Sequence, residues 1–117
     1  MQKLIQSLFS ARQIAHEFHL RSLSYAEHVA LGDFYDSLLE LTDDLIETHQ
    51  GQYGIVNDYL PLKKCDDSNA LSFLKNFSNE LNTLKSSISS SDTHLLNIFD
   101  EIMALVYKTI YKVENLK

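Results

Sequence analysis

The sequence has few residues that turn or break a chain: three of its 117 residues are glycine, one is proline, and none is tryptophan. A β-sandwich needs many turns, so this composition argues against an all-β fold. No run approaches the ~18–20 consecutive apolar residues of a membrane span, and the start, MQKLIQSLFSAR, lacks the features of a secretory signal. Because the single cysteine, Cys65, cannot form an internal disulfide, we expect a soluble protein of a reducing compartment such as the cytoplasm.

Basic residues are also scarce, since 10 Lys and Arg stand against 16 Asp and Glu and give a net charge of −6. That sign is unsuited to a protein that binds phosphate backbones, so we expect no nucleic-acid binding at physiological salt. The length leaves room for one hydrophobic core, and we expect residues 1–117 to form a single domain.

The apolar residues recur every three or four positions almost throughout, which predicts four amphipathic helices. The second is expected at Tyr25–Gln50, with Ser24 as its N-cap and Gly51 after its end. Asp66, Asp67 or Ser68 is expected to cap the third helix, and Ser91 or Asp92 the fourth. The residues expected to face the core are Leu4, Leu8, Ala11, Ala15 and Phe18; then Leu31, Phe34, Leu38, Leu41 and Leu45; then Ala70, Phe73, Phe77, Leu81 and Leu84; and last Leu95, Phe99, Ile102, Val106 and Val113.

One connection, residues 51–66, is much longer than the turns of a simple up-and-down bundle. Sixteen residues can reach ~55 Å, whereas the second helix is only ~39 Å long. The segment can therefore cross the whole bundle and start the third helix parallel to the second. The fold expected is an all-α, ferritin-like four-helix bundle with a long crossover between helices two and three.

The second helix is strongly acidic. No Lys or Arg occurs between Arg21 and Lys63, whereas the same interval holds eight Asp and Glu residues. Like charges three or four residues apart on a helix each cost a few tenths of a kcal/mol. Two interpretations stay open, namely a solvated acidic face and a surface that binds a cation.

Four side chains of the kinds that bind iron, manganese or zinc support the second interpretation, a surface that binds a cation. His16 and His28 stand twelve residues apart, and Asp43 and Glu47 follow His28 by fifteen and nineteen. Asp43 lies ~22 Å from His28 along a straight helix, so the four groups cannot share a metal within one chain. They can meet only if a second copy packs antiparallel about a two-fold axis.

This spacing, together with the stretch AEH-VALGDFYDSLLELTDDLIE, resembles the Dps proteins (DNA protection in starved cells), which are ferritin-like mini-cages. The resemblance implies that His16 and His28 of one chain and Asp43 and Glu47 of its mate bind Fe(II) as a ferroxidase site. It also implies oxidation of the iron by peroxide or O2, and storage of the ferric product inside a shell of twelve subunits. The implied partners are therefore iron and further copies of the chain.

Three departures from the family pattern favour an alternative. Glu17 stands where the family usually has Trp, Gly32 stands where an additional Asp is common, and the chain is several tens of residues shorter than typical members. The alternative is a non-enzymatic helical bundle, of viral origin or otherwise reduced, that binds a partner or ligand and keeps the fold without the chemistry. A structural adaptor dimer is a third, weaker interpretation.

The other candidate residues receive structural interpretations. His19 lies near the centre of the first apolar stripe and is expected to be packed or hydrogen-bonded instead of binding metal. His49 and His94 are expected at the surface. Cys65 follows Lys63 and Lys64, whose charges would lower the pKa of its thiol.

Overall fold

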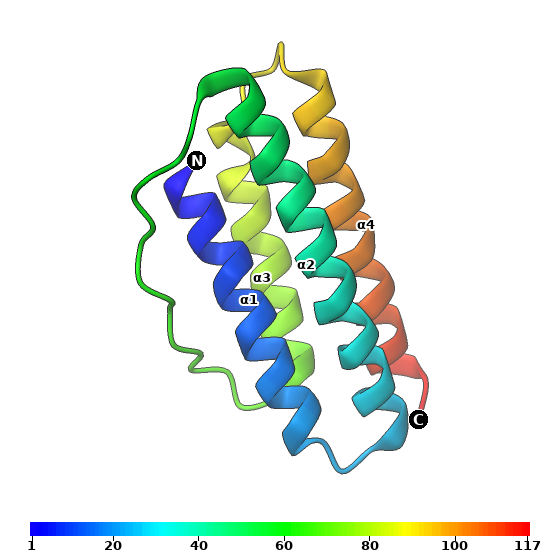
Figure 1. Ribbon diagram of the computed structural model, residues 1–117. Helices are drawn as coiled ribbons and strands as arrows, with labels where there is room; N and C mark the ends of the chain where they lie inside the picture. The colour runs from blue at the N-terminus through cyan, green and yellow to red at the C-terminus, as the bar shows by residue number, and fades with distance from the viewer.

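The computed structural model of the protein describes residues 1–117, and four α-helices account for most of them (Figure 1). The helices are α1 (Gln2–Arg21), α2 (Tyr25–Tyr53), α3 (Ala70–Leu84) and α4 (Thr93–Asn115), with a short 3₁₀ turn at Lys85–Ser87. The predicted all-α four-helix bundle is confirmed. No helix combines the length and the apolar character that crossing a membrane requires.

The helices form an elongated bundle of 43 × 26 × 21 Å. Helix α1 packs against α2 and α3, and α4 packs against the same two helices, so α2 and α3 lie diagonally opposite each other. Figure 1 shows that α2 and α3 run in one direction, whereas α1 and α4 run in the other.

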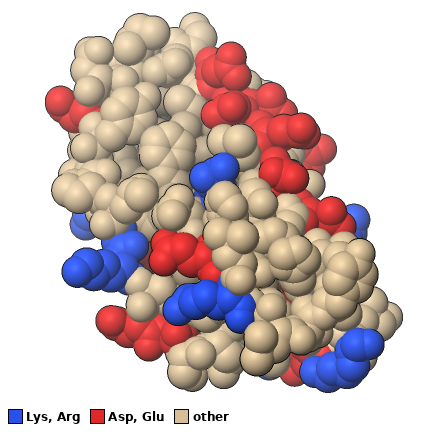
Figure 2. Space-filling view, turned by 60° about the horizontal axis from the view of Figure 1, so that its bottom comes forward, with Lys and Arg blue, Asp and Glu red and all other residues tan.

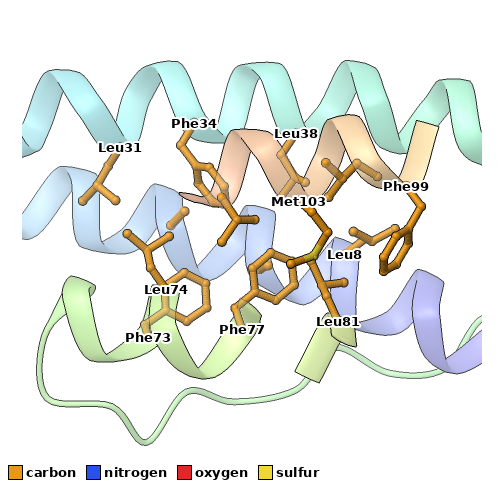
Figure 3. Packing of buried hydrophobic residues seen from close by; sticks show 14 of the residues in the cluster. Leu8, Leu31, Phe34, Leu38, Phe73, Leu74, Phe77, Leu81, Phe99 and Met103 are labelled. Carbon is orange, nitrogen blue, oxygen red and sulfur yellow. The ribbon is translucent and has the colours of Figure 1, made fainter. Parts of the chain in front are cut away.

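A single core fills the space between the helices, and it is built from the predicted apolar stripes. Figure 3 shows Phe73 and Phe77 of α3 pointing toward Phe34 and Leu38 of α2. The rings of Phe34 and Phe77 meet edge to face, with their centroids 6.4 Å apart. Each fully buried Leu or Phe stabilises the fold by roughly 1.5–3 kcal/mol. Of the twenty predicted core residues, only Leu41 and Leu84 are half-buried.

Two helix ends differ from the prediction. Helix α2 continues past Gly51 to Tyr53, and Gly54 ends it with a φ of +98°, a conformation that favours glycine. Helix α3 is capped by Asn69, whose side chain accepts a hydrogen bond from the Ser72 N–H at 2.9 Å, instead of by residues 66–68. The Ser24 cap of α2 is confirmed, because its hydroxyl accepts from the Glu27 N–H at 3.2 Å.

The long connection, residues 54–69, runs along the outside of the bundle beside α1 (Figure 1). Gln2 and Gln6 donate side-chain hydrogen bonds to the carbonyls of Asp58 and Pro61, at 3.2 and 2.7 Å. Farther along α1, Ser10 accepts from the Lys63 N–H at 2.9 Å. The segment therefore runs in the same direction as α1, and it returns the chain to the other end of the bundle before α3 begins.

Candidate functional site

The two histidines of the predicted metal site lie at the same end of the bundle, one on each of two adjacent antiparallel helices. His16 is half-buried on α1, and its ring stacks on Tyr35 of α2 with the centroids 4.4 Å apart. His28, also half-buried, lies in the first turns of α2. The fold therefore places both imidazoles at the contact between α1 and α2.

His28 is paired with His19, and the two residues hold the helices together. The Nδ1 of His19 is 2.6 Å from the carbonyl oxygen of His28, and the Nδ1 of His28 is 2.8 Å from the carbonyl oxygen of His19. The rings stack with their centroids 3.7 Å apart and an angle of 16° between their planes. A carbonyl oxygen only accepts, so each Nδ1 donates a proton, and the Nε2 of each ring takes part in no hydrogen bond. His19 is hydrogen-bonded and packed, as predicted.

Gly32 explains how the paired rings fit. A Cβ atom at this position would lie 3.0 Å from Cε1 and 3.2 Å from Nδ1 of His19, closer than such atoms normally approach. The His19 ring thus fills the space that a side chain at position 32 would need. Gly32 therefore leaves room for the His19 ring in its stack with His28.

Asp43 and Glu47 lie toward the opposite end of α2, and both are exposed. Neither carboxylate takes part in a hydrogen bond or an ion pair, since the three ion pairs of the chain are Lys63–Glu80, Lys75–Glu114 and Lys85–Asp100. No three His, Cys, Asp or Glu side chains come close enough together in one chain to hold a metal ion. A single chain therefore does not bring the two acids to the two histidines.

The acids of α2 form a continuous ridge. Figure 2 shows acidic side chains gathered in a band with few basic groups beside it. Six of the seven acids of α2 are exposed, and none of the six has a basic partner: Asp33, Asp36, Glu40, Asp43, Asp44 and Glu47. The predicted acidic face is present and unneutralised.

A polar cluster at the other end of the bundle was not predicted. Asp92 occupies the N-cap position of α4, but its carboxylate accepts hydrogen bonds from the Gln52 side chain, at 2.8 Å, and from the Tyr53 hydroxyl. These bonds lower the pKa of Asp92, and the bond to Asp92 raises the pKa of Tyr53. The partners lie about forty residues apart in the chain, so no local pattern indicates them.

Two predictions about individual side chains need correction. His94 is exposed, as predicted, but His49 is half-buried against Tyr53, and burial lowers its pKa. Cys65 is also half-buried, at a cavity of about 240 Å³ between α1, α3 and the 54–69 segment. Burial raises the pKa of its thiol, so the prediction of a lowered value is wrong.

Comparison with known proteins adds a family. The family model described as "Family of unknown function (DUF5856)" matches residues 19–113, which is most of the chain. The chain belongs to the DUF5856 family. His28, Asp43 and Glu47 lie within the matched range, and His16 lies just before it. Neither the comparison with curated proteins nor that with solved structures gives a match.

Proposed function

We propose that this member of the family binds and oxidises Fe(II) at a site shared by two copies, and that it stores the ferric product. His16 and His28 of one copy and Asp43 and Glu47 of the other would bind the iron. The observation that carries the proposal is that these groups occupy the two ends of one outer face with their metal-binding atoms unengaged. The acids have no ion pair, and His28 keeps a free Nε2.

The hydrogen bond from His28 supports a role as ligand. Histidines that bind metals usually donate their other ring N–H to a carbonyl or a carboxylate, which fixes the tautomer and aims the free nitrogen. His28 donates from Nδ1 to the His19 carbonyl in this way, at 2.8 Å. The imidazole is therefore held in one orientation, with its Nε2 free to bind a cation.

The connectivity is compatible with a ferritin-like fold. The 54–69 segment is long enough to return the chain to the far end, and α2 and α3 run in the same direction (Figure 1). In this proposal the segment corresponds to the ferritin-type crossover, and a shell of up to twelve copies would enclose the mineral.

The proposed reaction needs only iron and an oxidant such as peroxide. Two Fe(II) ions each give up one electron, and peroxide takes both electrons with two protons to become two waters. The carboxylates would stabilise the ferric product, because hard oxygen ligands suit the higher charge. The protein would contribute binding, orientation and negative charge.

A second candidate is a non-enzymatic bundle that binds a partner. It is favoured by the pair formed by His19 and His28, because both rings already have a structural role in joining α1 to α2. In that case the spacing match with Dps proteins is a coincidence. Iron binding then distinguishes the two candidates.

The test is an anaerobic Fe(II) titration of the wild type, five single variants and one double variant. His16→Ala and Asp43→Ala should each abolish binding, because each removes a ligand from the shared site. His19→Ala should leave most binding intact and lower the stability of the fold. Glu47→Gln should weaken binding more than Asp44→Asn, the matched control, which neutralises an exposed acid of the same helix. Equal binding by the wild type and the His16→Ala/Asp43→Ala double variant would refute the proposal.

A further inference from the structure

The outer face of α1 and α2 carries histidines at one end and unpaired acids at the other. On α2 the residues His28, Gly32, Tyr35, Leu39 and Asp43 follow at intervals of three or four, so they form one column along the helix. The histidines lie at one end of this column and the unpaired acids at the other. An inverted copy would therefore bring its acids to the histidines of the first copy.

Arg12 lies between these ends, and it is unusual among the basic residues of the chain. Its guanidinium carbon is 5.6 Å from the ring centre of Tyr35, so it sits level with that residue of α2. It is half-buried and forms no ion pair. Its Nε is enclosed and has no hydrogen-bond partner. A second copy cannot reach the enclosed Nε, but the half-buried side chain carries a positive charge without an acidic partner in a chain that has six more acids than bases.

We propose that Arg12 anchors a two-fold contact between two copies of this chain by binding the acids in the middle of the other copy's α2, chiefly Asp36. This inference rests on the shared site proposed above and adds the contact that would assemble it. By binding Asp36 of the other copy, Arg12 would favour the antiparallel arrangement of the two α2 helices.

The position of Arg12 along the bundle supports this pairing. A two-fold axis that brings the His28 end of one copy onto the Asp43 end of another crosses α2 halfway between them, between Tyr35 and Asp36. Arg12 lies at this level, beside Tyr35. The same axis brings the two Asp36 carboxylates toward each other, and the two arginines would neutralise that repulsion.

The apolar part of the face fits the same contact. Leu39 is 40% exposed and lies one turn beyond Tyr35, next to the proposed axis. A second copy would cover it with its own Leu39 and Tyr35. Burial of this apolar strip, with charge pairs around it, is the usual arrangement of a protein interface.

The experiment measures the mass of the metal-free protein by sedimentation over a range of concentrations. The wild type should form dimers that dissociate more readily at high salt. Arg12→Glu should raise the dimer dissociation constant about tenfold or more, because it places like charges at the centre of the contact. Arg12→Glu/Asp36→Arg should restore the dimer, since the reversed pair is again complementary.

Arg21→Glu is the matched control. It changes the net charge equally but lies at the end of α1, exposed, with its guanidinium over Phe18 of its own chain. It should leave the dissociation constant unchanged. If Arg12→Glu loses its helical circular dichroism, the salt dependence of the wild type and the behaviour of Arg12→Gln decide the question.

The outcomes separate this inference from the iron proposal. The inference about Arg12 is overturned if Arg12→Glu leaves the dimer dissociation constant unchanged. It is also overturned if the wild type is a monomer at micromolar concentration. A dimer that depends on Arg12 but binds no Fe(II) supports the inference and refutes the iron site alone.

Discussion

Replacing two glycines of α2, Gly32 and Gly51, by alanine tests whether His19 occupies the space beside Gly32. In the interior of a helix, alanine is about 1 kcal/mol more stable than glycine. At Gly51, in the last turn of α2, an added Cβ meets nothing within 4 Å. Gly51→Ala should therefore stabilise the fold by about 0.5–1 kcal/mol, which is roughly 4 °C per kcal/mol in Tm for a domain of this size.

Gly32→Ala should behave differently, although it lies in the same helix. Its Cβ would lie 3.0 Å from the His19 ring, so the ring must move and strain its stack on His28 and the hydrogen bonds at 2.6 and 2.8 Å. Losing one such hydrogen bond costs about 1 kcal/mol, which offsets the gain in helix propensity. We expect a net change near zero or destabilising.

A double-mutant cycle isolates the contact. In a His19→Ala background the space is open, so Gly32→Ala should recover the full gain seen at Gly51. Urea denaturation of the four proteins of the cycle gives a coupling free energy, expected at about 1 kcal/mol or more. If Gly32→Ala stabilises the wild type as much as Gly51→Ala does, the His19 ring does not lie against Gly32 and the argument fails.

Three further predictions concern the Asp92 carboxylate, the Cys65 thiol and the net charge of the chain. Because the pKa of Asp92 is lowered, its ionised form contributes stability above about pH 4 that is lost as the pH falls through the folded-state pKa. Asp92→Asn should flatten this loss in urea denaturation at about pH 2–6, and an unchanged acid slope would contradict the pairing with Tyr53. Cys65 should react with iodoacetamide more slowly than a free thiol, since burial raises its pKa, and a rate that matches the unfolded chain would exclude this. With a charge of −6, the protein should give no DNA gel shift at ~0.15 M salt, and a retained shift would overturn that expectation.

The core was predictable because it depends on local periodicity. A stripe such as Leu4, Leu8 and Ala11 must be buried whatever it packs against, and these three side chains are almost fully buried. The Ser24 cap was predictable for the same reason, since cap and acceptor are three residues apart. Helix type, order and number follow from such short-range rules.

Helix ends were harder to predict from the sequence, because several neighbouring residues can cap each end. Gly51 and Gly54 are both suitable stops for α2, and the structure ends the helix at Gly54, the glycine with a positive φ. Asp92 shows a different limit. Its side chain was expected to cap its own helix, but Gln52 and Tyr53 bind it across the bundle end.

Periodicity and composition are enough to predict four amphipathic helices, one core and an acidic second helix that contains no Lys or Arg. The sequence also determined that His28 and Asp43 cannot meet within one chain, because helical rise separates them by ~22 Å. Only the packing of the helices shows which side chains already take part in contacts within the chain. The pairing of His19 with His28, the space taken at Gly32 and the unpartnered Nε of Arg12 arise from contacts between α1 and α2. Such contacts depend on how two helices rotate and slide against each other, and no periodicity within one helix encodes that register.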